Sequence, residues 1–270
     1  MGLFFPDDPG YDLSVRQTGF NRYKQLLSLY FGGWLKVNLL TLAGAVPLAA
    51  GILFSVLSSS ILVLIPCALL GGMLFGPFLA GMYDAVLRGL RDDPNHWWKN
   101  YKRSWKQNWK GSLLPGAILG LLLGMYAFMG MLFWWSQVPV GLGTVALYLL
   151  SGLVVLLLCT LYWPQLVLFQ QSPLSRLQNA ILFCAKYLWR VLGVALLQLA
   201  YWAVYFFFAP WTLFLLPIIG VWFVVFLSQF LIYDQLNQEL QIEAQYRRAG
   251  MIPQVEVPDA AEEESGEPEQ

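Results

Sequence analysis

Four side-chain amides lie inside long apolar segments of the chain and are candidate ligand-binding groups: Asn38, Gln165, Gln198 and Gln229. An amide both donates and accepts hydrogen bonds. If these amides converged beside aromatic rings, they would suit a neutral polyhydroxylated ligand such as a sugar. The alternative is that each amide hydrogen-bonds a neighbouring helix, the common role of uncharged polar residues in membrane helices. The sequence leaves both interpretations open.

Other residue types that carry out chemistry are sparse. The single histidine, His96, has no second histidine or nearby cysteine to share a metal with. The three cysteines, Cys67, Cys159 and Cys184, are too widely separated to indicate a disulfide framework. Away from their ends the apolar segments lack Asp, Glu, Lys and Arg, which disfavours an intramembrane proton relay. We therefore expect a non-enzymatic protein with no catalytic residues, no metal and no cofactor.

The most distinctive stretch is residues 93–110, which is both aromatic and basic. Asp93 followed by Pro94 is typical of a helix start. At helical spacing, one stripe contains Trp98, Tyr101, Trp105 and Trp109, and the neighbouring stripe contains Lys99, Arg103, Lys106 and Lys110. This pattern predicts a helix lying flat on the membrane, with its rings toward the acyl chains and its cations on anionic headgroups. Its apolar flanks argue against nucleic-acid binding.

The positions of the aromatic and basic residues suggest where the chain meets the membrane surface. Tryptophans near cations are predicted interfacial anchors: Trp34, Trp98, Trp105, Trp109 and Trp189. Hydrophobic residues make up 58% of the chain and charged residues 12%, about half the charged share of a soluble domain. Apolar runs of 18 or more residues recur, and we therefore predict an all-α membrane protein. We expect six transmembrane helices, at 37–57, 61–83, 112–134, 145–169, 191–208 and 211–233.

Glycines at four-residue spacing, Gly72 with Gly76 and Gly116 with Gly120 and Gly124, predict close packing of helices. Asp84 lies four residues before Arg88, a spacing that predicts an ion pair along one helix.

The charges predict the orientation of these spans. All 16 Lys and Arg residues fall in four segments, which six spans place on one side of the membrane. The opposite turns, near 58–60, 135–144 and 209–210, carry no charge. The positive-inside rule then places both termini in the cytoplasm.

An internal repeat divides the membrane domain, residues 18–235, into three units. Each unit is an interfacial amphipathic helix followed by a two-span hairpin, and the units cover about 18–92, 93–171 and 172–235. Residues 1–17 are predicted to be a flexible lead. Residues 236–270 are predicted to be a cytoplasmic helix extension followed by an acidic disordered tail.

The segment 76–83 (GPFLAGMY), the Trp-rich stretch after it and the entry to the first span at 37–40 (VNLL) resemble the YesL-like family of bacterial integral membrane proteins. The resemblance spans roughly residues 20–235 and brings no catalytic residues with it. It implies a plasma-membrane protein of uncharacterised activity, often encoded beside sugar-uptake genes. We therefore expect an accessory or scaffold for carbohydrate uptake, with a transporter component as partner. The alternative is a transporter or channel for a neutral solute such as a sugar.

Overall fold

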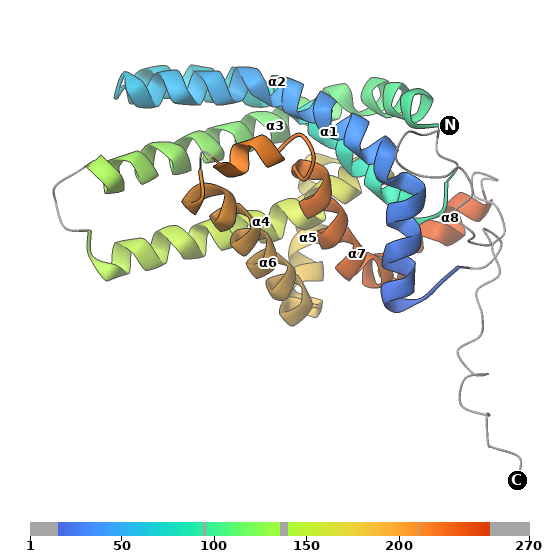
Figure 1. The fold of residues 1–270 in the computed structure, drawn as a ribbon. Coiled ribbons are helices and arrows are strands. Elements are labelled where there is room, and N and C mark those ends of the chain that lie inside the picture. The colour runs from blue at the N-terminus through green and yellow to red at the C-terminus, as the bar shows by residue number, and fades with distance from the viewer. Residues whose placement is uncertain (1–15, 94–95, 136–139, 210, 249–270) are drawn as a thin grey trace, which may run out of the picture.

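The computed structural model describes residues 16–93, 96–135, 140–209 and 211–248, and these are helical with no strand among them. The predicted flexible lead and acidic tail lie almost wholly outside the described residues. The helices are α1 (Gly19–Leu57), α2 (Ile61–Leu90), α3 (Trp97–Trp135), α4 (Leu142–Leu168), α5 (Pro173–Lys186), α6 (Leu188–Phe207), η1 (Trp211–Leu215), α7 (Val221–Leu240) and α8 (Ile242–Arg248). In Figure 1 the turns of the α1–α2 and α3–α4 hairpins form the left end of the molecule, while α1 begins at the right, near α7 and α8.

Two of the predicted surface helices are not separate helices. Residues 97–110 continue without a break into the third predicted span, so α3 has 39 residues and a length of about 58 Å. In the same way α1, also of 39 residues, joins the first amphipathic stretch to the first span. This differs from the predicted helix lying separately in the membrane plane. Only the third unit has a distinct surface helix, α5, which Tyr187 separates from α6.

Glycines hold α2 and α3 in backbone contact. A Cβ atom added to Gly116 would lie 2.5 Å from the carbonyl oxygen of Gly72 and 2.8 Å from the Cα of Gly76. One added to Gly120 would lie 2.6 Å from the Cα of Gly72. The close packing expected from glycines at four-residue spacing is therefore present. This packing aligns α3 with α2.

The predicted six-span architecture is not confirmed. Within the described residues, five helices are long and apolar enough to cross a membrane: α1, α2, α3 as far as Phe133, α4 and α6. The predicted sixth span is interrupted, because η1 and a turn at residues 216–220 precede α7. Pro217 and Gly220 disfavour a continuous helix at this turn.

The hairpin formed by α6, η1 and α7 ends well short of the turn between α1 and α2. Its turn lies beside Asn38, which donates hydrogen bonds to the backbone oxygens of Leu216 and Pro217. From Asn38, α1 continues to Leu57, a further distance of about 28 Å along the helix. Figure 1 shows η1 (orange) set back from the ends of the α1–α2 and α3–α4 hairpins. The C-terminal hairpin is therefore shorter than the other two.

Candidate functional site

The candidate site lies where α2 ends and α3 begins. Asp84 and Arg88 are one turn apart on α2, and the ion pair expected from their spacing is present, with 2.8 Å between Arg88 Nε and Asp84 Oδ2. Arg88 also pairs with Asp93, which follows α2 in the loop. The chain leaves the helix at Asp92, whose φ of 61° is left-handed. Arg88 is thus held between two carboxylates.

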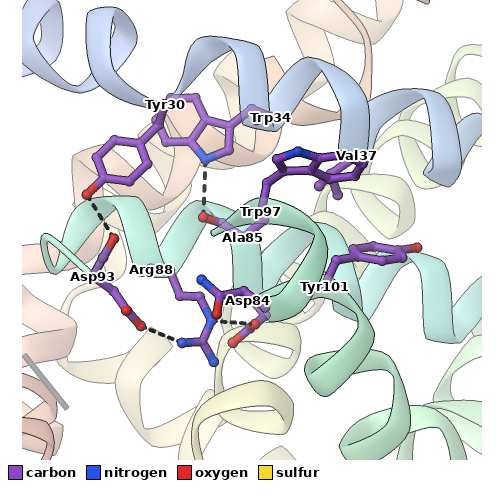
Figure 2. Close-up of a pocket in the computed structure, with 11 residues that line it drawn as sticks. Tyr30, Trp34, Val37, Asp84, Ala85, Arg88, Asp93, Trp97 and Tyr101 are labelled. Atoms are coloured by element: carbon purple, nitrogen blue, oxygen red, sulfur yellow. Dashed lines mark hydrogen bonds and ion pairs between the residues drawn. The ribbon is translucent and has the colours of Figure 1, made fainter. Parts of the chain in front are cut away.

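Side chains of α1 close over this ion pair, as Figure 2 shows. The Tyr30 hydroxyl donates to the backbone oxygen of Asp93 at 3.0 Å, and the Trp34 indole donates to that of Ala85 at 3.1 Å. Trp34 is 1% exposed and stacks against Trp222 of α7. It is therefore a core residue, whereas its predicted role as an interfacial anchor requires a ring that reaches the lipid. The ring is buried because α2 and α7 both pack against the face of α1 that carries it.

A small cavity lies within this site. It has a volume of about 20 Å³ and is lined by Asp84, Asp93, Trp97 and Tyr101, among others. One water molecule needs about 10–15 Å³. Within the described residues the Tyr101 hydroxyl is buried without a hydrogen-bond partner, and Figure 2 shows it pointing away from the Asp84–Arg88 ion pair. The cavity fits a single water and is too small for a sugar.

A second charged cluster adjoins the first and joins the two ends of the described chain. Arg22 donates to both carboxylate oxygens of Asp92, at 2.7 and 2.9 Å. Arg16 Nη1 lies 2.7 Å from Glu243 Oε1 on α8, and Arg16 Nη2 donates to the backbone oxygen of Leu90 at 2.9 Å. Burial alone would lower the pKa of Arg16, but Glu243 and Asp92 outweigh it and the pKa is raised. The N-terminal end of α1, the α2–α3 loop and α8 are therefore tied together.

Asn38 lies apart from the other three amides. Besides donating to Leu216 and Pro217, it accepts a hydrogen bond from the backbone N–H of Trp222 at 3.3 Å. Its side chain therefore satisfies backbone groups that the interrupted helix leaves free. Non-helical backbone at membrane depth requires partners of this kind, because lipid offers none.

Two of the other amides meet at Thr160 of α4. Gln198 donates to the Thr160 hydroxyl at 2.7 Å and to the Ser228 hydroxyl at 2.8 Å. Gln229 donates to the Thr160 backbone oxygen at 3.0 Å. Gln165 only donates to Leu161 of its own helix. The four amides are buried and do not converge on one cavity.

The predicted lipid-facing residues of α3 divide into two groups. The four cations, Lys99, Arg103, Lys106 and Lys110, are exposed, as are Trp98, Trp105 and Trp109. Trp189 of α6 is 81% exposed. Tyr101 differs because its ring packs against Gly81 of α2 and is buried. The exposed members remain available for lipid contact, while Tyr101 joins α3 to the core.

An apolar groove lies between α3, α4 and α5. It has a volume of about 380 Å³, and its lining includes Leu119, Leu158, Trp163 and Leu177. Its lining is apolar and membrane helices flank it, so acyl chains are expected to fill it. The amides line neither this groove nor the cavity beside Asp84.

Sequence reasoning missed several residues that build these clusters: Arg16, Thr160, Ser228 and Glu243. Thr160 and Ser228 carried a usable signal, since hydroxyls in apolar helices commonly bond other helices. Arg16 and Glu243 are 227 residues apart, and no local pattern relates them.

The long apolar helices, together with charges gathered at one end of the bundle, define a polytopic all-helical membrane protein. Residues 34–129 match the family described as "Protein of unknown function, DUF624", which contains the YesL-like proteins. The match covers about a third of the chain. No curated protein and no solved structure matches this chain.

Proposed function

We propose that the chain is a non-enzymatic membrane protein that acts as an accessory or scaffold for carbohydrate uptake in the bacterial plasma membrane. The observation that carries the proposal is the exposed basic and aromatic face of residues 97–110, which is continuous with a membrane-spanning segment of α3. Such a face suits contact with anionic headgroups and with another protein at the membrane surface. The link with carbohydrate rests on the resemblance to the YesL-like family.

The hydrogen bonding of the buried amides supports a structural role for them. Asn38 completes the backbone of an interrupted helix, and Gln198 and Gln229 join α6 and α7 to α4. The alternative function, transport of a neutral solute, needs these amides to face a shared hydrated cavity. Their geometry lends it no support.

A crosslinking experiment tests the accessory role. A photoreactive residue at Gln107, which is exposed on α3, would be activated in native membranes before extraction in mild detergent. The expected result is a covalent adduct with a component of a carbohydrate transporter. The same photoreactive residue at Leu62, 80% exposed at the opposite end of the bundle, is the matched control. Repeated recovery of the uncrosslinked protein alone would contradict the proposal.

A further inference from the structure

Arg91, at the end of α2, is an incompletely paired buried charge. Its side chain is 0% exposed, and its Nε, Nη1 and Nη2 atoms make no hydrogen bond with any residue that the structure describes. The nearest Asp93 carboxylate oxygen lies 3.8 Å from Nη2, beyond hydrogen-bonding distance. Arginine stays protonated in proteins, and a buried charge without hydrogen bonds is strongly unfavourable. The guanidinium group therefore has the capacity to bind an anion that the structure does not supply.

The segment covering Arg91 is α8. The ring of Tyr246 lies over the guanidinium group, 4.1 Å from its carbon to the ring centroid. On the same short helix, Glu243 pairs with Arg16 and Ile242 is completely buried. Thus α8 covers Arg91 with an aromatic ring and neutralises Arg16 with a carboxylate.

The short helix α8 depends on tertiary contacts to keep its conformation and position. It has seven residues, and helices this short do not hold together in water without tertiary contacts. Gln241, which joins it to α7, has a left-handed backbone conformation with φ of 47° and ψ of 42°. A non-glycine residue in this conformation costs about 1 kcal/mol or more. The position of α8 therefore depends on its contacts with Arg16, Arg91 and the core.

We propose that Arg16 and Arg91 form a binding site for a negatively charged phosphate group, and that α8 fills this site with Glu243 when no ligand is bound. Guanidinium groups bind phosphate oxygens through paired, charge-assisted hydrogen bonds. Arg16 is already oriented by its bond to Leu90. The phosphate group comes from an anionic lipid headgroup or from a soluble phosphate.

Charge balance supports an exchange of anions. Four arginines of the two clusters, Arg16, Arg22, Arg88 and Arg91, face four carboxylates, Asp84, Asp92, Asp93 and Glu243. Displacement of α8 removes one carboxylate and leaves an excess positive charge. A bound phosphate group restores the balance and supplies Arg91 with the hydrogen bonds it lacks.

Hydrogen exchange of residues 242–248 in the full chain, in detergent, measures the displacement directly. Three additions are compared: dihexanoyl phosphatidylglycerol, dihexanoyl phosphatidylcholine and inorganic phosphate. We expect faster exchange of this segment with phosphatidylglycerol, with phosphate or with both, and no change with the zwitterionic lipid. A response to phosphatidylglycerol alone assigns the site to a headgroup, and a response to phosphate assigns it to a soluble ligand. Equal responses to the two lipids, or no response at all, would overturn the proposal.

Two variants and a control separate ligand binding from simple loosening of α8. Glu243→Gln removes the competing carboxylate and should lower the half-saturating ligand concentration about tenfold, since a hydrogen bond between charged groups contributes at least that much. Arg91→Gln should raise it about tenfold or more. Glu239→Gln, which removes the exposed carboxylate paired with Lys186, should leave it unchanged. Unchanged exchange protection of α2 and α3 shows that each variant is folded. If Arg91→Gln binds as the natural chain does, the site is elsewhere.

Discussion

At the scale of single residues, buried polar side chains compensate for backbone that is not helical. Asn38 contacts two backbone groups of the turn before α7 and one in the first turn of α7, from a helix 178 residues or more away in sequence. Tyr201 supports the same turn by donating to the backbone oxygens of Ile219 and Gly220, at 2.6 and 3.0 Å. A turn of this kind persists among apolar helices only if such partners are present.

The first prediction concerns Asn38→Leu. The substitution keeps a similar volume but leaves the backbone oxygens of Leu216 and Pro217 and the N–H of Trp222 without their side-chain partner. We expect the free energy of unfolding to fall by about 2 kcal/mol or more, because buried groups without hydrogen bonds cost about 1–3 kcal/mol each. Reversible unfolding in mixed micelles measures the change.

Gln165→Leu is the matched control for this substitution. Gln165 donates only to Leu161 of its own helix, and its buried Oε1 has no partner. Its replacement should change the free energy of unfolding by less than about 1 kcal/mol. Equal losses in the two variants would contradict the role assigned to Asn38.

The exposed cations of α3 make a second residue-scale prediction. Replacing Lys99, Arg103, Lys106 and Lys110 with Gln should weaken attraction to anionic lipid by about 1 kcal/mol per charge, and by less at high salt. Native mass spectrometry with mixed phosphatidylglycerol and phosphatidylcholine measures the lipid preference. A variant with Lys at position 103 and Arg at the other three keeps the charge and should keep the preference. An unchanged preference in the Gln variant would exclude these cations as a lipid contact.

At the scale of elements, the contact between α2 and α3 depends on the absence of side chains. Gly72 and Gly76 face Ser112, Gly116 and Gly120, and the two backbones touch. Apolar side chains gain little from leaving lipid, so close van der Waals contact is the main attraction between such helices. An atom added at this contact would meet backbone atoms, which cannot move aside as a flexible side chain could. It would therefore push the two helices apart.

The third prediction compares two glycines of α3. Gly116→Val places its Cβ against the Gly72 carbonyl and should destabilise the α2–α3 pair by about 3 kcal/mol. Gly111→Val, on the same helix, meets nothing within 4 Å and should be neutral. Thermal unfolding of both purified variants gives the comparison. Similar melting temperatures would show that the helices do not rely on this contact.

At the scale of the whole molecule, both described ends of the chain lie at one end of the bundle. The ion pair between Arg16 and Glu243 links them, and the cluster around Asp92 lies beside it. The turn of the C-terminal hairpin lies at the depth of Asn38, so α6 and α7 form a shallower hairpin than α1 and α2. The four long helices extend beyond it.

Cysteine labelling tests this arrangement and the orientation predicted from the charges. In a variant without the native cysteines, a membrane-impermeant maleimide added outside intact cells should label Ser59→Cys and not Gln107→Cys. It should also fail to label Thr212→Cys, because Leu216 and Pro217 in the same hairpin bond Asn38, which lies about 28 Å along α1 from Leu57. External labelling of Gln107→Cys would reverse the orientation, and labelling of Thr212→Cys would show that α6 crosses completely.

Local sequence patterns predicted much of this protein. Apolar run length predicted spans that lie within α1 and α2, and spans whose ends lie within about three residues of those of α4 and α6. Glycines at four-residue spacing predicted the α2–α3 packing, and the four-residue separation of Asp84 and Arg88 predicted their ion pair. These features depend on helical periodicity, which a sequence displays directly.

Long-range contacts decided the rest. Periodicity could not show that residues 97–110 and the following span form one helix, which packs along α2. Nor could it show that Asn38 supports the turn before α7 while Gln198 and Gln229 meet at Thr160. Trp34 is a core residue because α2 and α7 both pack against it, and Arg91 lies under α8. The partner of each group comes from a distant part of the chain, so only the tertiary structure could bring them together.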